Sequence, residues 1–419
     1  MTFPEEFRQQ MENLLGAEAG EFFAAMQRPP EISIKMNVRK SRNAADAGYG
    51  DLERVGWCAN GYYLPERPRF TLNPLLHAGV FYVQDASSMI YETLAEKIVP
   101  MALDTGSPLR VLDMCAAPGG KTTSLINALP DGSLVVANEF VASRAAVLRE
   151  NLIKWGYPDI VVTNSPTSAF ASLPESFDIV AVDAPCSGEG MMRKEDVALT
   201  QWNKGLIRQC ATLQRAILTD AFRTLKPGGF LIYSTCTFNR EENEDNVRFM
   251  VEELGLTPFD PELPEELGIA KGFDTPYPML RFMPHVTRGE GLFAAVLRKE
   301  GDFAPAPRIR PEIFMRRLEA ATKSICIGIP ATVAKGKEEI PASESVLSTA
   351  FKSDALPASD VNESTALAYL RHEAITLPAN TPRGFVVVRY KGHPLGLVKN
   401  IGSRANNLYP KAWRIRIKE

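Results

Sequence analysis

The stretch VLDMCAAPGGKT, residues 111–122, indicates the fold class of this chain. A short apolar run, typical of a buried strand, leads into a turn with two adjacent glycines and then into a helical pattern. Doubly wound α/β folds use such a turn to bind a nucleotide-like ligand at the carboxyl edge of a parallel sheet. We therefore expect this stretch to form the first strand of such a sheet and its ligand-binding turn.

Strands and helices alternate downstream of this stretch. Helical patterns lie at 142–155 and 206–225, and the second is expected to end at Lys226-Pro-Gly-Gly. The alternation predicts a parallel, doubly wound sheet, closed by an antiparallel hairpin of residues 279–283 and 292–298. The four further strands are expected at LVVAN (134–138), IVVT (160–163), DIVAV (178–182) and FLIYS (230–234). The apolar face of the second helix is predicted to comprise Leu206, Cys210, Leu213, Ile217 and Leu225.

The regions on either side of the sheet differ from it in composition. Apolar residues at helical spacing predict one helix over residues 4–27, and an alternating pattern predicts a strand at 32–40. Segments rich in Pro, Ala, Ser and Lys indicate boundaries after the sheet. The expected divisions are an N-terminal α+β region at 1–78, the sheet-forming domain at 79–300, a linker and middle region at 301–364, and a small β-rich domain at 365–419.

The composition excludes several classes of protein. The chain has 419 residues, of which 45% are hydrophobic and 23% charged, which is close to the globular average and far from that of disordered or fibrous chains. No apolar run approaches the ~18 residues that a membrane helix needs, so we expect a soluble, cytoplasmic protein. The six cysteines form no CxxC pair and there are only four histidines, so neither a metal nor disulfides are expected.

Charge is distributed unevenly along the chain. The net charge is only −3, but residues 380–419 contain nine Lys or Arg residues and one acid, a local charge of +8. The segment 241–253 contains six acids and one Arg. A basic C-terminal region favours a polyanion as partner, although a solvated basic surface would have the same composition.

The glycine-rich turn does not fit the common phosphate-binding motifs. A Walker A loop requires Gly where this chain has Cys115, and the GxGxxG dinucleotide motif is absent. The next predicted strand ends at Asn138-Glu139, where an acid can bind a ribose diol. A site for adenosine without a pyrophosphate indicates S-adenosylmethionine as the cofactor.

Two cysteines follow neighbouring strands of the predicted sheet. Cys186 lies in DAPCSGEG (183–190) and Cys236 in YSTCT (233–237), both in polar turns at the edge where such folds place active sites. Cys58, Cys210 and Cys326 are expected to be core residues, since packing is the usual role of a lone cysteine.

Two thiols beside a methyl donor have a chemical rationale. The C5 carbon of cytosine is a poor nucleophile, and addition of a thiolate to C6 activates it. A free thiol of pKa near ~8.5 is mostly protonated at neutral pH, so the site must remove its proton. Asp183 could hydrogen-bond N3 and the exocyclic amine of the base, and Lys121 is the best-placed cation.

These motifs together resemble the Sun/Fmu-type (Nop/Sun) RNA cytosine-5 methyltransferases. CAAPGGKT, DAPCSGEG and STCT occur in the family's order, with VQDAS (83–87) before the sheet and PHVTRGEGLFAAVLRK (284–299) at its end. The segment GFVVVRYKGHPLGLVKNIG is similar to the PUA-like tail of the bacterial small-subunit ribosomal RNA branch. The resemblance implies a Rossmann-like methyltransferase sheet at 79–300 and RNA-binding regions on both sides of it, with ribosomal RNA, possibly in the small subunit, as partner. Oligomeric state stays open.

The resemblance also implies roles for individual residues. Cys236 would be the nucleophile, Cys186 would help to release the product, and Asp183 would contact the cytosine. The family usually has an Asp after the third strand for the adenine; here Asn164 or Ser165 would replace it. The implied residues that line the S-adenosylmethionine site are Cys115, Ala116, Ala117, Pro118, Gly119, Gly120, Lys121, Glu139, Arg144, Ser165 and Asp183.

Three alternatives have different sequence requirements. In a DNA cytosine-5 methyltransferase the Pro-Cys cysteine is the nucleophile, and the thiol of the Thr-Cys motif would be unneeded. A non-catalytic RNA-binding assembly factor with the same fold would be expected to lose one cysteine or the Gly-Gly turn, and neither is lost. An amino-group methyltransferase would have Pro-Pro-aromatic where this chain has Ala184-Pro-Cys186.

Overall fold

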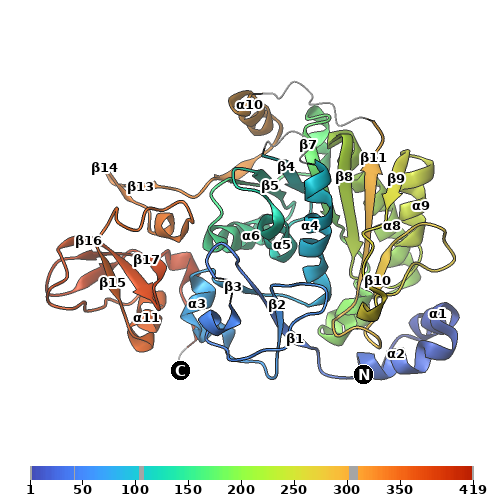
Figure 1. The fold of residues 1–419 in the computed structure, drawn as a ribbon, viewed down its shortest axis with the longest axis horizontal. Coiled ribbons are helices and arrows are strands. Elements are labelled where there is room, and N and C mark those ends of the chain that lie inside the picture. Colours follow the sequence, from blue (N-terminus) through green and yellow to red (C-terminus); the bar gives the residue numbers. More distant parts are fainter. Residues whose placement is uncertain (1, 42, 103–107, 302–309, 418–419) are drawn as a thin grey trace.

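The computed structural model describes residues 2–41, 43–102, 108–301 and 310–417. Its longest axis runs from the N-terminal helices α1 (Glu5–Leu15) and α2 (Ala19–Met26) at one end to a β-rich C-terminal region at the other (Figure 1). A large sheet lies between them.

Within the described residues, the central sheet has nine strands. Five strands pair in parallel, as predicted, and four more are added through antiparallel pairs. These four include the predicted closing hairpin, formed by β10 (Leu280–Phe282) and β11 (Leu292–Lys299). The strands, in spatial order, are β10 (Leu280–Phe282), β11 (Leu292–Lys299), β8 (Leu225–Thr235), β7 (Phe177–Asp183), β4 (Arg110–Asp113), β5 (Leu134–Asn138), β6 (Ile160–Thr163) and β12 (Ser324–Ile327), and β9 (Leu256–Phe259) pairs with β11.

Both faces of this sheet are covered by helices. Alternate residues of a strand point to opposite faces, so Val135 and Ala137 pack in one apolar cluster while Val136 packs in the other. This is why the buried strands are near-continuous apolar runs in the sequence. The helices on the first face are α4 (Ile90–Ala102), α5 (Gly120–Ala128) and α6 (Ala142–Trp155), and those on the second are α8 (Lys204–Thr224), α9 (Glu244–Glu252) and α10 (Pro311–Ala321).

The strand order reverses at β4, which has β5 on one side and β7 on the other. Ligands of open α/β sheets bind in the crevice at the carboxyl ends of the strands, at such a switch point. The topology therefore places the turns after β4, β5, β7 and β8 around one crevice.

The N-terminal region differs from the prediction in two elements: the strand expected at 32–40 ends at Met36, and the first helix is not continuous. The helix expected at 4–27 is broken into α1, a 3-10 turn at Gly16–Glu18 and α2, because Gly16 adopts a φ of 55° that a continuous helix does not allow. Aromatic side chains of both helices pack against Phe238 and Trp202, which lie near the carboxyl ends of the strands. The region also contains a three-stranded antiparallel sheet of β1 (Ile32–Met36), β2 (Gly61–Leu64) and β3 (Phe81–Val83), with α3 (Pro74–His77) between β2 and β3 along the chain.

The C-terminal region forms a separate four-stranded sheet. The segment 301–364 is expected to be a linker and middle region, but two of its strands join neighbouring sheets. Strand β12 pairs with β6, and β15 (Ala358–Asp360) pairs with β16 (Gly384–Tyr390). The Pro-rich residues 302–309 lie outside the described residues. The elements of this region are β13 (Thr332–Lys335), β14 (Glu338–Pro341), β15 (Ala358–Asp360), α11 (Glu363–Leu370), β16 (Gly384–Tyr390), β17 (His393–Asn400) and β18 (Ala405–Asn407).

Helix α8 buries only part of the predicted face: Ile217 is buried as predicted, but Leu206 and Cys210 are only half-buried. Its buried residues include Ile207, Leu218 and Ala221, whereas Leu213 is 49% exposed. Leu213 and Ile217 line a cavity at the carboxyl edge of the sheet. The apolar pattern of the helix therefore includes residues that line this cavity as well as residues of the core. The predicted stop at Lys226-Pro-Gly-Gly begins two residues after the end of the helix and lies within β8.

Candidate active site

The glycine-rich turn joins β4 to α5, as predicted, and its shape depends on Gly119. This residue has a φ of 110°, and a Cβ added to it would lie 3.2 Å from Leu148 Cδ1. The Thr122 hydroxyl donates to the buried Asp113 carboxylate at 2.6 Å, and the Arg144 guanidinium donates to the Ala117 carbonyl at 2.8 Å. The turn is thus held from β4 below and from α6 at its side.

A cavity of about 560 Å³ opens at the carboxyl ends of β4, β5 and β7. This volume lies within the usual range for small-molecule sites, about 300–1,000 Å³. The lining residues combine apolar groups with a few polar ones: Met114, Cys115, Asn138, Glu139, Phe140, Arg144, Pro166, Thr167, Asp183, Ala184, Pro185, Cys186, Gly188, Met191, Leu213, Ile217 and Cys236.

The donor and acceptor set of this cavity fits S-adenosylmethionine. Glu139 is 4% exposed and follows β5, where its carboxylate can accept hydrogen bonds from a ribose diol. One of its oxygens accepts from the Val141 amide at 2.7 Å, and the other lies 3.6 Å from Arg144 Nη1. Phe140, which is 69% exposed, and Pro166 supply apolar surface for a base. Burial raises the pKa of Cys115, so this lining residue is a neutral thiol.

The two predicted cysteines lie side by side at the edge of this cavity. Cys186 follows β7 and Cys236 follows β8, and their Sγ atoms are 3.2 Å apart. The hydrogen bond to Cys236 and burial together raise the pKa of Cys186 well above its usual value. Cys186 therefore stays a protonated thiol in contact with the Cys236 sulfur.

Asp183 lies at the end of β7 within a short polar chain. Lys121 Nζ is 2.7 Å from its carboxylate, and the Ser234 hydroxyl donates to its other oxygen at 2.6 Å. Ser234 also contacts the hydroxyl of Tyr91, a fully buried residue of α4, at 2.8 Å. Burial opposes the charge on Lys121, but the Asp183 carboxylate outweighs it and raises the pKa of the ammonium above its usual value. The pair is thus a fixed ion pair at physiological pH.

The structure brings most, but not all, of the predicted residues to the cavity wall. Cys115, Glu139, Arg144, Asp183 and both thiols line it, whereas residues 116–121 form the turn behind it. Ser165 is buried and its hydroxyl accepts from the Lys323 amide, so it is not a lining residue, and Thr167 from the same loop lines the cavity instead. This departure has a physical reason: residue 323 precedes β12, a strand whose pairing with β6 the sequence did not indicate.

Two contributors were missed by the sequence analysis. Tyr91 and Ser234 support Asp183, but Tyr91 comes from a helix that precedes the sheet and belongs to no motif. Ser234 lies within the quoted YSTCT segment, and its position one residue before the strand end is the signal that could have indicated it.

Two further properties of the described residues concern partners. No helix within the described ranges is long and apolar enough to cross a membrane. In the same part of the chain, no group of three or more His, Cys, Asp or Glu side chains could hold a metal ion.

The cavity lies at the switch point of the sheet, an acid follows β5, and the turn after β4 is not a phosphate-binding loop. These features define the class of the S-adenosylmethionine-dependent methyltransferases. Comparison with known proteins supports this class. Residues 100–298 match the family model of the 16S rRNA methyltransferase RsmB/F, residues 3–86 that of the N-terminal domain of 16S rRNA methyltransferase RsmF, and residues 357–415 that of the methyltransferase RsmF PUA domain.

Individual relatives extend this similarity over almost the whole chain. The chain is 31% identical to the ribosomal RNA small subunit methyltransferase F of Enterobacter sp. (strain 638), over 98% of this chain and 95% of that protein. It is 36% identical to the same-named protein of Pectobacterium atrosepticum, over 73% of this chain and 65% of that protein. A solved methyltransferase homologue from Pyrococcus horikoshii superimposes with a TM-score of 0.59 at 27% identity, covering 71% of this chain and 95% of that one.

The chain therefore belongs to the ribosomal RNA small subunit methyltransferase F family. As a member it is an S-adenosylmethionine-dependent RNA methyltransferase with a Rossmann-like sheet, an RsmF-type N-terminal domain and a C-terminal PUA domain, which confirms the predicted enzyme class, cofactor and fold.

Proposed function

We propose that this chain transfers a methyl group from S-adenosylmethionine to C5 of a cytosine in small-subunit (16S) ribosomal RNA, through a covalent bond between Cys236 and C6. The observation that supports this most directly is the pair of thiols, with Sγ atoms 3.2 Å apart, at the edge of a cavity whose polar groups fit the cofactor. An enzyme that methylates an amino group has no use for a nucleophilic thiol beside its methyl donor.

Cys236 begins the reaction in this proposal. Its thiolate attacks C6, a C–S bond forms, and the displaced electron pair makes C5 nucleophilic. When bound, S-adenosylmethionine supplies an electrophilic methyl group, which C5 takes as the methyl–sulfur bond breaks. The cytosine must leave its stack to reach both groups, so the target is a flipped base or a single-stranded residue.

Cys186 assists the last step. The C5 proton is lost to solvent, the C6–S bond breaks, and the C5–C6 double bond returns as Cys236 leaves as a thiolate. Because the pKa of Cys186 is raised by its hydrogen bond to Cys236 and by burial, its S–H remains available to donate to that departing sulfur. A charge-assisted hydrogen bond of this kind stabilises the leaving group.

Asp183 recognises the base while Lys121 holds Asp183 in place. The carboxylate can accept a hydrogen bond from the exocyclic amine of the cytosine, which orients the base for attack at C6. The 2.7 Å ion pair with Lys121 and the bond from Ser234 restrict the carboxylate to one orientation. A fixed orientation of this kind is worth more than flexible contacts, since a positioning group must meet the base without reorganisation.

We propose that the cofactor binds along the turn and the ends of the first three parallel strands. Glu139 would bind the ribose diol and Arg144 would stabilise both Glu139 and the turn. The backbone of Cys115, Ala116, Ala117, Pro118, Gly119 and Gly120, with Lys121 and Asp183 behind the reacting centre, would enclose the remainder of the ligand. Ser165 would act through the loop that presents Thr167.

The substrate assignment rests on the family and on the ends of the chain. The predicted RNA-binding regions at 1–78 and 365–419 correspond in position to the RsmF-type N-terminal and PUA domains, and residues 380–419 have a local charge of +8. Such regions bind RNA through phosphate, 2′-hydroxyl and shape contacts. A ribosomal substrate would place the reaction in the cytoplasm, on naked RNA or on an assembled small subunit.

Bisulfite sequencing of 16S ribosomal RNA tests this proposal. RNA from a strain that lacks the gene should lose protection at one or more cytosines, and expression of the chain should restore it. A complete, unchanged set of protected cytosines in the deletion strain would overturn the proposed substrate. A DNA enzyme would instead lose protected cytosines in genomic DNA, so the same strain should be sequenced for both.

A further inference from the structure

Each thiol lies in a loop that also contains one fully buried glutamate. The Cys186 loop (residues 184–190) includes Glu189, and the Cys236 loop (residues 236–243) includes Glu242; both side chains are 0% exposed. Each carboxylate bonds the backbone of the opposite loop. Each loop thus contributes a carboxylate that accepts hydrogen bonds from the backbone of the other loop.

Glu242 holds the residues on both sides of Cys186 in place through hydrogen bonds. Its carboxylate accepts from the Ser187 amide at 3.0 Å and from the Ser187 hydroxyl, and from Gln214 Nε2 at 2.7 Å. Gln214 Nε2 also donates to the Pro185 carbonyl at 2.9 Å. The peptide groups immediately before and after Cys186 are therefore bound to one buried pair.

Glu189 fastens the segment that follows Cys236. Its Oε2 accepts from the amides of Phe238 at 2.6 Å and Asn239 at 2.9 Å. The next residue, Gly190, donates its amide to the Cys236 carbonyl at 2.9 Å, and a Cβ on this glycine would lie 3.0 Å from that oxygen. Glycine is therefore needed here for the two loops to approach this closely.

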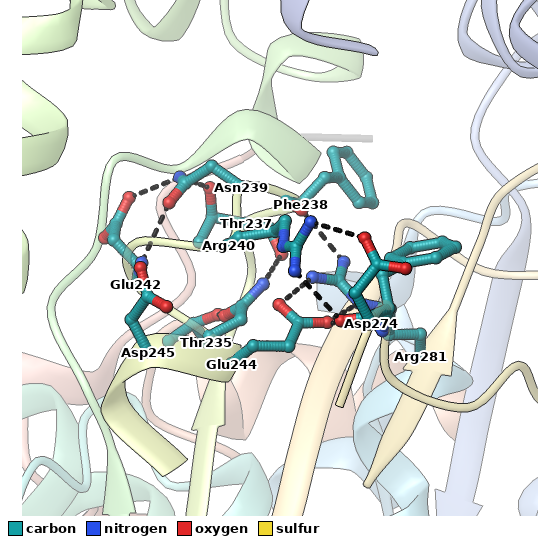
Figure 2. Close-up of polar contacts among 12 residues, drawn as sticks. Thr235, Thr237, Phe238, Asn239, Arg240, Glu242, Glu244, Asp245, Asp274 and Arg281 are labelled. Atoms are coloured by element: carbon teal, nitrogen blue, oxygen red, sulfur yellow. Dashed lines mark hydrogen bonds and ion pairs between the residues drawn. The ribbon is translucent and has the colours of Figure 1, made fainter. Parts of the chain in front are cut away.

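Asn239 connects the two carboxylates. Its side-chain amide donates to Glu242 at 2.7 Å, and its own oxygen accepts from the Glu242 amide (Figure 2). The same amide lies 3.3 Å from Glu189 Oε1. Beyond it, the buried ion pair of Arg281 and Glu244 binds the Phe238 carbonyl at 2.9 Å. Figure 2 shows this pair beside the Glu242 and Asn239 contacts.

We propose that Glu189 and Glu242 are positioning residues that hold Cys186 and Cys236 at contact distance by bonding each other's loops. The proposal rests on the proposed function, in which the thiols act as a donor and acceptor pair. Both glutamates accept only, and all of their partners named above are neutral donors. A carboxylate suits such a site better than an amide, because an NH₂ group would face N–H donors and leave them unpaired at considerable cost.

The variants that test this are Glu242→Gln and Glu189→Gln, each isosteric with the native side chain. Glu92→Gln is the matched control. Glu92 is also buried (1% exposed) and accepts only from the side-chain amides of Asn60 and Asn127, but these contacts join α4 to the N-terminal region and to α5. Thermal unfolding of all three reports any general loss of stability.

The distance between the thiols is tested without RNA. Diamide accepts two hydrogens as two thiols join in one disulfide, and the Cys186–Cys236 peptide pair is then quantified by mass spectrometry over time. Wild type and Glu92→Gln should form this disulfide at the same rate, since the sulfur atoms need only approach from 3.2 Å to the covalent distance of about 2.05 Å. Glu242→Gln and Glu189→Gln should form it about tenfold more slowly.

Steady-state methylation supplies the second readout. A misplacement of about 1 Å costs on the order of 10²-fold in rate, so kcat should fall by about that factor in both variants while KM for S-adenosylmethionine stays within a few fold. If Glu242→Gln unfolds, Ser187→Ala replaces it, because this change removes one donor and leaves the carboxylate intact; a several-fold slowing of both reactions is then expected.

The outcomes separate this inference from the proposed function. Disulfide formation at the wild-type rate in the folded variants would overturn the positioning role, whatever happens to methylation. Slowed disulfide formation in a protein whose wild type forms no 5-methylcytosine would overturn the proposed function and leave the reciprocal bonding of the loops intact. Equal slowing in Glu92→Gln would assign the effect to general loss of stability and also overturn the proposal.

Discussion

The cofactor-side turn at residues 115–121 and the two cysteine loops lie at the same edge of one sheet, but they are built differently. The turn depends on the local conformation of Gly119, whose φ of 110° is available within a few residues of sequence. The cysteine loops depend on contacts between residues about 50 positions apart, such as that between Ser187 and Glu242. A locally encoded turn can be recognised as a motif, whereas a pair of loops held by distant carboxylates cannot.

The largest expected effect comes from removing the thiol that the loops present. Cys236→Ala should abolish methylation, since no group remains to activate C5, and should leave S-adenosylmethionine affinity within a few fold, since the turn is untouched. Isothermal calorimetry and a methyl-transfer assay measure the two properties. Full turnover by this variant would show that the loops do not supply the nucleophile.

The second prediction separates the two thiols. Cys186→Ala should still add to cytosine but complete elimination slowly, so protein should stay covalently joined to RNA. Cys236→Ala and the double variant should form no such adduct. A denaturing gel of each variant with substrate RNA and S-adenosylmethionine shows the adduct as a slow band. A band from Cys236→Ala with none from Cys186→Ala would reverse the roles and give the arrangement of a DNA enzyme.

The third prediction concerns the turn. Gly119→Val forces a β-branched side chain into a positive φ and places its Cβ 3.2 Å from Leu148 Cδ1. Such strain costs about 1–3 kcal/mol, so calorimetry should show S-adenosylmethionine binding weakened by about tenfold or more. Gly255→Val is the control, because Gly255 has a φ of 70° with no atom near its Cβ position and lies away from the cavity. Equal affinity in the two variants would contradict the assigned role of the turn.

A smaller effect is expected from the basic C-terminal region. Lys399 and Arg404 are exposed on and beside β17. Replacing both with Ala should weaken RNA binding and reduce the slope of log K against log salt by about 0.7–0.9 for each phosphate that the variant no longer neutralises. Lys97→Ala, which removes an exposed charge from α4, should leave the slope unchanged. An unchanged slope in the double variant would mean that this region has a solvated basic surface.

The smallest effect concerns support of the turn by the N-terminal region. Lys35 on β1 donates to the Gly120 carbonyl at 3.0 Å, and burial lowers its pKa to about 7. Between pH 7 and about 10 the unfolded chain therefore binds more protons at this site than the folded one, so the free energy of unfolding rises with pH. Lys35→Met should flatten that rise in urea unfolding, although Lys40, whose pKa burial also lowers to about 7, preserves part of it. The same slope in both proteins would show that Lys35 is charged in the folded state.

Much of the fold was predictable because its signals are local. The bounds of β5, β6 and α6 equal the predicted ones, since buried parallel strands are short apolar runs and α6 has a clear helical pattern. The prediction failed for two reasons. The local φ of Gly16 breaks the first helix, and distant contacts place Leu213 at a cavity and β12 in the central sheet. Periodicity alone cannot tell an apolar face that packs in the core from one that lines a site.

The sequence by itself determined which chemical groups the active site contains, because the Gly-Gly turn, Asp183 and the two thiols each follow a strand, and parallel strands end at one edge. Only the tertiary structure decided how these groups are arranged. Three kinds of contact join residues tens of positions apart. They are the contact of the two sulfur atoms at 3.2 Å, the ion pair of Lys121 with Asp183, and the hydrogen bonds that Glu189 and Glu242 each accept from the opposite loop. Such contacts are stable when burial prevents water from competing for the same donors and acceptors. That burial exists only in the folded chain.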